Sequence, residues 1–543
     1  MTKIGLFISR CDGVVSETID LYKLKDEFSE SCEVVKVVDN FYKPEDLKEI
    51  LKEVEVKELD AVIFAGNSKH YFNKVEKGKY IIGLLEKKGI NVNKIKFANL
   101  KEWIALPHKD DRKGATEKAK SLIKVMLERI KFEELIEMIR VTPRKEIAII
   151  GANIAGILAA KRFLTQGYRV HIIDDKPQFS ELGKYKDKLL PTQTFVNLNS
   201  KADCFLNTEI EDVYGFAGNY HLRLNTNGNF ENINVGGIVI ADGANKKLTD
   251  KVHPLLHIDI DDAGLFKTLN NDTLCVETKD PGITVIRESI NAGTCSHVEK
   301  NSVCTTELRE ISNLVNSAVL HLTAFLSQNE IIHESLISEV DENVCGGCGT
   351  CVKTCMFHAS KIDPVRKISM TDPLRCKGCG NCVTACPTGA KDLLTHSNKY
   401  LFSTIEILSK CNIEGDKVLL MVCDDCGYAG LDYAGENGTT YPVNFLPMNV
   451  KCAGRVDTQS ILYAFKGGFK GVIICECSMG RCNNIVGNVD LDRRANLFRQ
   501  ILKSRGINPE RLRILGMTPC EGGACITEGK KFYESLAGLG GEL

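Results

Sequence analysis

Short apolar runs alternate with amphipathic segments along most of the chain, which is the pattern of α/β domains. Four such runs near the amino terminus predict the strands of a small sheet, at residues 3–8, 33–38, 60–65 and 95–98. A long helix is expected from about residue 114 to 140. The Thr142-Pro143 pair then ends this part, because proline disfavours helix in the residue before it.

The same alternation returns further along the chain. From Glu146 the sequence predicts a strand, a glycine turn, a helix and a second strand that ends at Asp174, with later strands at 220–224 and 235–241. Near the carboxyl end we expect two strands and three helices, at 417–422, 471–475, 457–466, 490–504 and 526–537. We therefore predict an α/β multidomain protein with domains at 1–142, 143–335, 336–400 and 412–543.

Composition narrows the classes of protein. The 543 residues carry 70 basic and 71 acidic side chains, so nothing indicates binding to nucleic acid or to a charged membrane surface. The most apolar stretch, about 147–160, is shorter than the roughly 20 residues of a membrane helix and is interrupted by glycine. The first ten residues read as a strand and not as a secretion signal. We expect a cytoplasmic protein without direct membrane insertion.

Cysteine is the one residue type out of proportion. There are 23 cysteines, of which 17 lie from residue 345 onward. In a reducing compartment, clustered thiols are more often metal ligands than disulfides. This uneven distribution predicts metal chemistry in the last third of the chain.

The strongest motif is a doubled run of cysteines between 345 and 387. Each run has the C-x2-C-x2-C-x3-C spacing of bacterial-type ferredoxins, in which the fourth cysteine ligates the cluster of the other run. The spacing predicts a two-cluster ferredoxin domain over 336–400. One [4Fe–4S] cluster is assigned to Cys345, Cys348, Cys351 and Cys386, and the other to Cys376, Cys379, Cys382 and Cys355. Two zinc sites or inert thiols are the alternative.

A third group of cysteines lacks this spacing and suits a [2Fe–2S] cluster or tetrahedral zinc equally well by ligand chemistry. The segments MVCDDCGYAGLDYAG, FLPMNVKCAGRVD and GFKGVIICECSMGRCNNIVGN resemble the delta subunit of methyl-viologen-reducing hydrogenase, a [2Fe–2S] family, over about 415–543. The resemblance implies five candidates for four ligand positions: Cys423, Cys426, Cys452, Cys477 and Cys482. Cys475 stands where the family usually has a small residue. Cys520 and Cys525 are expected to be ordinary buried thiols, and His108 a structural residue.

A dinucleotide-binding turn is predicted after the strand at 146–150. Gly151 and Gly156 keep the first and last glycines of the fingerprint, Asn153 replaces the middle one, and Asp174 is the acid after the second strand. The first glycine makes the turn, and the helix amino terminus is where pyrophosphate binds. Asn153 stands where the backbone of a dinucleotide-binding turn approaches phosphate. Two interpretations of this turn therefore remain: a working dinucleotide site, and a scaffold that keeps the fold without a cofactor.

Residues 1–140 and 144–390 resemble the A subunit of heterodisulfide reductases, an FAD and iron–sulfur family. The segments ANLKEWIALPHKDDRKGATEKAKSLIKVM, GANIAG, INAGTCS and EVDENVCGGCGTC occur in the family's order. The resemblance implies a reduced FAD-binding Rossmann-like domain, with FAD held by Gly151, Asn153, Gly156, Asp174, Gly293 and Thr294. The family's amino-terminal cluster cysteines are missing, since only Cys11 and Cys32 remain there, so we expect no cluster in that domain.

The two resemblances together imply a fusion of these subunits. We expect an electron-transfer subunit that relays electrons between a [2Fe–2S] site, two [4Fe–4S] clusters and a flavin or partner subunit. The implied partners are heterodisulfide reductase-like subunits and a hydrogenase or formate dehydrogenase, with ferredoxin as a further candidate. Two alternatives remain: an FAD-containing, electron-bifurcating oxidoreductase in its own right, and a docking module with structural metal.

Overall fold

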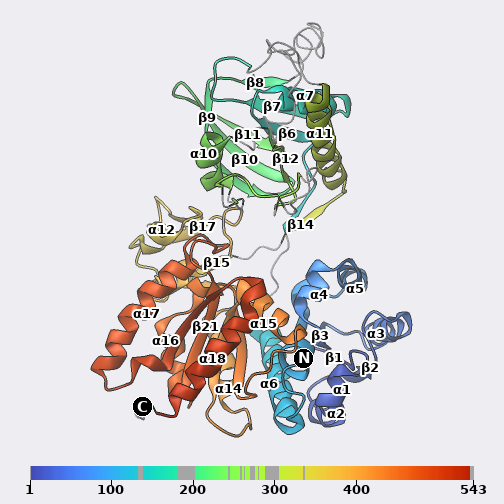
Figure 1. The fold of residues 1–543 in the computed structure, drawn as a ribbon, viewed down its shortest axis with the longest axis vertical. Coiled ribbons are helices and arrows are strands. Elements are labelled where there is room, and N and C mark those ends of the chain that lie inside the picture. Colours follow the sequence, from blue (N-terminus) through green and yellow to red (C-terminus); the bar gives the residue numbers. More distant parts are fainter. Residues whose placement is uncertain are drawn as a thin grey trace. The chain divides into compact units, whose positions relative to one another are not determined.

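The computed structural model divides the chain into two units (Figure 1), Met1–Ile136 with Leu336–Leu543, and Glu137–Ser335. The structure describes residues 2–132, 139–179, 202–241, 245–256, 258, 260–261, 263–268, 276–278, 280–287, 305–333 and 337–538. In these residues no helix is both long and apolar enough to cross a membrane.

The amino-terminal sheet of the first unit is parallel, with strand order β2-β1-β3-β4. Its strands coincide with the four predicted runs: β1 Ile4–Ser9, β2 Val34–Val38, β3 Ala61–Gly66 and β4 Ile95–Asn99. The helices of this part are α1 Val14–Thr18, α2 Leu21–Phe28, α3 Pro44–Val56, α4 Lys69–Lys74, α5 Glu76–Lys87 and α6 Arg112–Phe132, with the π-helix η2 at Lys101–Ala105.

The long helix α6 ends earlier than its sequence pattern predicts. It is described as far as Phe132, and Ile139–Val141 forms strand β5, which pairs antiparallel with β14, Ile331–His333. The expectation of helix up to residue 140 was therefore wrong. The reason is physical: the backbone of β5 is satisfied by a partner strand far along the chain, which local periodicity does not reveal.

The carboxy-terminal sheet of the first unit repeats the same topology, with order β20-β19-β21-β22 and all pairs parallel. Its strands are β19 Val418–Cys423, β20 Phe445–Val450, β21 Gly471–Cys477 and β22 Leu512–Met517. Its helices are α14 Asn398–Ser409, α15 Cys426–Glu436, α16 Thr458–Lys466, α17 Gly487–Ser504 and α18 Gly522–Leu536. Because strand residues alternate between faces, Leu420 packs on the side of α15 and α18, and Met421 packs on the side of α14 and α16.

The two sheets of this unit share one hydrophobic core. Leu6 and Ile8 of β1 belong to the same buried cluster as Leu420 of β19. At the junction, η2 lies against α15, and a Cβ on Gly435 would come within 2.0 Å of the Glu102 carbonyl oxygen. Only glycine permits this approach, so the amino-terminal part is built into the unit that carries most of the cysteines.

The cysteine-rich part, which lies between the two sheets along the chain, consists of two similar halves. Strand β15 (Ser338–Val340) pairs with β18 (Lys391–Leu393), and β17 (Ser369–Thr371) pairs with β16 (Ser360–Ile362). Each half adds one short helix, α12 Thr350–Thr354 or α13 Asn381–Thr384. Each half contains one run of the cysteine repeat, and the two halves have the same order of secondary structure.

The second unit contains a five-stranded sheet of order β13-β12-β6-β7-β8, with β6 Glu146–Ile150, β7 Arg169–Ile173, β8 Asp203–Phe205, β12 Gly237–Ile240 and β13 Ile283–Val285. Helices α7 Ile154–Thr165 and α11 Thr305–Leu326 pack on one face. A three-stranded antiparallel sheet, β9 Thr208–Phe216, β10 Asn219–Thr226 and β11 Asn229–Val235, packs with α10, Lys246–Leu256, on the other. The strands predicted at 220–224 and 235–241 correspond to β10 and β12.

Candidate metal centres

The first group of thiols surrounds a hollow of ≈ 310 Å³, counting its opening to solvent. Its cysteines are Cys345, Cys348, Cys351 and Cys386, three from the first run and one from the second. Gly347 and Gly349 line the same space with φ of +65° and +75°, and a Cβ on Gly347 would lie 2.0 Å from the Lys367 carbonyl oxygen. These left-handed turns bring the thiols of one short loop toward one space.

The second group surrounds a hollow of ≈ 340 Å³, and its cysteines are Cys355, Cys376, Cys379 and Cys382. The fourth cysteine of each run thus lies with the other run, which is the exchange that the ferredoxin spacing predicts. Four cysteine thiols line each hollow. Cysteine thiolates are the ligands by which proteins hold iron–sulfur clusters. The residues around the two hollows therefore fit two such clusters.

In each hollow a serine hydroxyl contacts the corresponding cysteine sulfur. The Ser369 hydroxyl lies 3.2 Å from the Cys351 Sγ, and the Ser338 hydroxyl lies 3.4 Å from the Cys382 Sγ. The backbone N–H of Ser369 also donates to the Cys345 Sγ at 3.3 Å. Donors of this kind stabilise negative charge on sulfur and tune the reduction potential of a bound cluster.

The third group of thiols lies at the carboxyl edge of the β20-β19-β21-β22 sheet. Cys423 ends β19, Cys477 ends β21 and Cys452 follows β20. The chain leaves β19 for β20 on one side and then crosses to β21 on the other, and such a change of direction opens a crevice at the strand ends. The Cys423 and Cys477 sulfurs lie 3.9 Å apart in this crevice.

All five predicted candidates meet here. The thiols of Cys423, Cys426 and Cys482 donate to the Cys477 sulfur and lower its pKa. The pKa of Cys482 is raised because its thiol donates to Cys452 and Cys477. In the parts of the chain that the structure describes, no three Cys, His, Asp or Glu side chains are arranged to hold a single metal ion.

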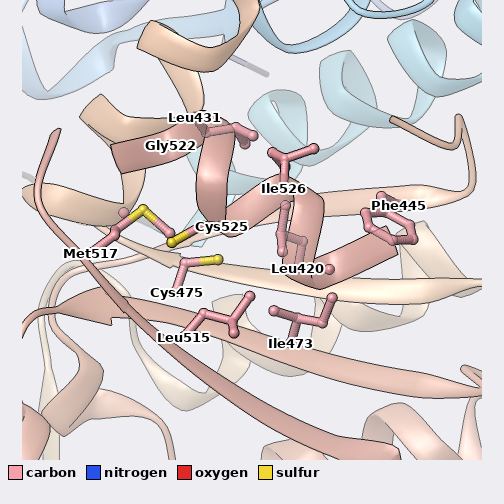
Figure 2. Close-up of a pocket in the computed structure, with 12 residues that line it drawn as sticks. Leu420, Leu431, Phe445, Ile473, Cys475, Leu515, Met517, Gly522, Cys525 and Ile526 are labelled. Atoms are coloured by element: carbon pink, nitrogen blue, oxygen red, sulfur yellow. The ribbon is translucent and has the colours of Figure 1, made fainter. Parts of the chain in front are cut away.

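Cys475 lies apart from this group, in an apolar pocket shown in Figure 2. Its neighbours there include Met517, Cys525 and Ile526, and burial raises the pKa of the Cys475 thiol. Burial also raises the pKa of Cys525 to about 11. Cys475 and Cys525 are therefore core residues. Cys520 is exposed, so the expectation that it is buried was wrong: it lies in a short 3-10 turn on the surface.

The second hollow and the carboxy-terminal thiols adjoin each other. Helix α13 packs on η3, Ala453–Arg455, the turn that follows Cys452, and the Thr384 hydroxyl donates to the Gly454 carbonyl at 3.1 Å. Burial raises the pKa of Cys379, and charge on Cys452 raises it further. Cys382 lies on α13, so thiols of two predicted clusters lie on or next to elements that pack together.

Two buried cations in this region were not predicted from the sequence. Arg455 is fully buried behind Gly380, and its guanidinium donates to the His396 carbonyl and to carboxylate and amide oxygens of Asp457 and Asn398. Lys391, 1% exposed, lines the first hollow. The serines on the sulfurs were detectable from the repeat, because Ser338 and Ser369 hold equivalent positions. The two cations carry no such signal.

The predicted flavin turn is described from Gly151 to Asp174, whereas Gly293 and Thr294 lie outside the described residues. The Asp174 carboxylate accepts the Ala152 N–H at 2.6 Å. Asn153 caps α7: its Oδ1 accepts the Gly156 N–H at 2.9 Å and its Nδ2 donates to the Ala241 carbonyl at 2.9 Å. The side chain that replaces the middle glycine therefore covers the helix end where pyrophosphate would bind, and this part of the turn does not fit FAD.

Two family models match parts of this chain. Residues 344–390 match the family described as 4Fe-4S dicluster domain, and residues 418–540 match methyl-viologen-reducing hydrogenase, delta subunit. The A subunit of the ferredoxin:CoB-CoM heterodisulfide reductase of Methanosarcina mazei is 35% identical over 221 residues, which are 40% of this chain and 28% of that protein. The chain therefore spans little more than a quarter of that relative.

Hydrogenase subunits are covered more fully. The iron-sulfur D subunit of the F420-non-reducing hydrogenase of Archaeoglobus profundus is 34% identical over 105 residues, 19% of this chain and 77% of that protein. The vhu iron-sulfur D subunit of the F420-non-reducing hydrogenase of Methanopyrus kandleri is 31% identical over 127 residues, 23% of this chain and 96% of that protein. Through its carboxy-terminal part, the chain belongs to the family of methyl-viologen-reducing hydrogenase delta subunits, here joined to a 4Fe–4S dicluster domain and to sequence similar to the A subunits of heterodisulfide reductases.

Proposed function

We propose that the chain is an electron-transfer subunit with three iron–sulfur clusters. Two [4Fe–4S] clusters would occupy the two hollows, and a [2Fe–2S] cluster would be held by four of the five thiols at the carboxyl edge of the β20-β19-β21-β22 sheet. The observation that carries this proposal is the packing of α13, which bears Cys382, on the turn that follows Cys452, since these two cysteines belong to different predicted clusters. It supports one continuous row of sites.

The order of the row follows from the contacts. The carboxy-terminal thiols adjoin the second hollow through α13 and η3, and the second hollow shares the ferredoxin-like part with the first. When bound, an iron–sulfur cluster takes up or releases one electron at a time. At the carboxy-terminal site Cys452 and Cys477 are 3% and 5% exposed, whereas Cys348 in the first hollow is exposed.

The relatives support the partners that we propose. Their names place them in heterodisulfide reductases and in F420-non-reducing hydrogenases. We propose that the carboxy-terminal part docks on a hydrogenase or formate dehydrogenase, and that heterodisulfide reductase-like subunits or ferredoxin exchange electrons with the other end, in the cytoplasm.

A second candidate function is an FAD-containing bifurcating enzyme. The position of the Gly151–Gly156 turn between β6 and α7 favours it, and the Asn153 cap opposes it. Replacing Asn153 by Gly uncovers the helix end. Flavin bound by the natural chain after anaerobic purification would support the bifurcating enzyme, and flavin bound only by the Asn153→Gly variant would support the relay.

Metal and cofactor analysis of the whole chain tests the proposal. Anaerobic purification followed by iron, sulfide, zinc and flavin quantitation should find about ten iron atoms per chain, four, four and two. A preparation with zinc and little iron would instead support a docking module with structural metal.

A matched pair of variants tests whether the three cluster sites form one electron-transfer chain. Cys379→Ala should lose about four iron atoms and stop electron transfer between the [2Fe–2S] site and the first hollow. Cys475→Ala, which removes a thiol of the neighbouring apolar pocket, should lose none. Loss of soluble protein in Cys379→Ala would show that the clusters hold the whole unit together.

A further inference from the structure

Lys391 is a buried lysine that lines the first hollow, and its ammonium contacts Ser338, which lines the second. Its side chain is 1% exposed, and its ammonium donates to the Thr371 hydroxyl at 2.6 Å and to the Ser338 hydroxyl at 3.3 Å. The Ser338 hydroxyl in turn lies 3.4 Å from the Cys382 Sγ. One hydroxyl therefore separates the ammonium from a sulfur of the second hollow.

This cation breaks the internal symmetry of the ferredoxin-like part. Lys391 faces Val340 in the β15–β18 pair, and Ser360 faces Thr371 in the equivalent β16–β17 pair. Ser360 is also buried, but it carries no charge. The two halves thus share their backbone and their sulfur-bound serines, and they differ by one buried positive charge.

The charge of Lys391 is not neutralised by a carboxylate. In the described part of the chain no ion pair includes Lys391, whereas Arg455, which is also buried, lies 3.3 Å from Asp457. A buried ammonium without an anionic partner is costly. A cluster bound by four thiolates is negatively charged and becomes more so on reduction, so it would supply the missing counter-charge.

We infer that Lys391 is a positioning and tuning residue that favours reduction of a cluster in the second hollow over one in the first. The inference rests on the proposed function, because it requires both clusters. The ammonium acts through space on the Cys376 and Cys382 side of the second hollow.

The test is a redox titration of the full chain, purified anaerobically and followed by the paramagnetic signal of its reduced clusters. Lys391→Met keeps the length and burial of the side chain and removes its charge. The Ser338 and Thr371 hydroxyls lie 3.2 Å apart and remain bonded to each other. We expect the one-electron reduction constant of the second cluster to fall about tenfold, or about 59 mV, with a smaller change for the first.

Further variants make this result specific. Lys391→Arg keeps the charge and should stay within about twofold of the natural chain. Lys353→Met removes an exposed charge on α12, which water screens, and should shift neither step. Cys348→Ala, which takes a ligand from the first hollow, assigns the remaining [4Fe–4S] step to the second. If Lys391→Met fails to load clusters, Lys391→Ser, which copies Ser360, replaces it.

The outcomes separate the two proposals. A natural chain without [4Fe–4S] clusters would overturn the proposed function. Fully loaded Lys391→Met or Lys391→Ser with unchanged potentials, or with the larger shift in the first cluster, would overturn only the role of Lys391. A tenfold fall in the second cluster that Lys391→Arg does not show would support it.

Discussion

The two parallel sheets of the first unit have one topology and different chemistry. Both have their first strand beside the second and third, as β2-β1-β3-β4 and β20-β19-β21-β22. In both, the carboxyl ends of the first and third strands frame a crevice. In the carboxy-terminal sheet that crevice collects five thiols, whereas the amino-terminal sheet fills it with its own polar side chains.

The amino-terminal crevice shows how such an edge is closed. The Cys11 thiol donates to the Asn67 Oδ1 at 3.6 Å, and its N–H is bonded to the Ser9 hydroxyl at 3.0 Å. A Cβ on Gly66 would lie 2.9 Å from the Ser9 Cβ. Burial raises the pKa of Cys11 to about 12. The fold therefore supplies a place for ligands, and the residues at the strand ends decide whether it is used.

The largest effect expected from this comparison is loss of a cluster. Cys477→Ala removes the sulfur that contacts three of the other thiols and should lose about two of ten iron atoms, with loss of electron transfer through the carboxy-terminal site. Iron and sulfide quantitation and the visible spectrum measure the loss.

Cys11→Ala, at the corresponding edge of the other sheet, is the matched control and should keep all the iron. Loss of iron from Cys11→Ala and not from Cys477→Ala would mean that the amino-terminal sheet, and not the carboxy-terminal sheet, holds a cluster at its carboxyl edge.

A smaller effect is expected where the sheets join. Asp432 of α15 accepts hydrogen bonds from the Ser68 hydroxyl at 2.5 Å and the Asn99 amide at 2.8 Å, and lies 3.1 Å from the His70 Nδ1. Asp432→Ala leaves these groups without their common acceptor. We expect the free energy of unfolding to fall by about 2–3 kcal/mol, measured by denaturant titration of the whole chain.

Glu436 on the same helix provides the control. Its carboxylate pairs with Lys101 but is 51% exposed, so Glu436→Ala should change the free energy of unfolding by less than about 1 kcal/mol. Equal losses in both variants would mean that the Asp432 contacts do not join the sheets.

A pH dependence is expected at the same junction. Lys118 of α6 is buried against the Tyr441 ring, its ammonium 2.9 Å from the His108 Nε2, and burial lowers the Lys118 pKa to about 7. Between about pH 7 and 10.5 the unfolded chain therefore binds this proton and the folded chain does not, so the contribution of Lys118 to stability increases with pH. Thermal melting at several pH values measures it.

Lys118→Met removes this dependence. Its melting temperature should exceed that of the natural chain by the largest margin at pH 7 and below, and the margin should narrow toward pH 10. A margin that stays constant with pH would show that the lysine is not neutral in the folded chain.

Local patterns predicted much of this molecule because they report local physics. Alternating apolar runs located the four strands of the amino-terminal sheet and two strands of the carboxy-terminal sheet, β19 and β21, but not β20 and β22. The cysteine repeat located the thiols of both hollows. Residue spacing is itself the cause here, since short glycine-rich turns determine which sulfurs face one space. The resemblances added the carboxy-terminal thiols, which have no such spacing.

Long-range packing decided the rest. Nothing local shows that residues 4–8 share a core with β19, that Asn153 closes the predicted flavin turn, or that Cys475 lies apart from Cys477 two residues later. The sequence alone determined which residues have the chemistry to bind iron and sulfide. Only the tertiary structure decided which of them meet, and that Lys391 is buried beside them with no carboxylate partner in the described part of the chain, because burial and charge depend on neighbours that are distant along the chain.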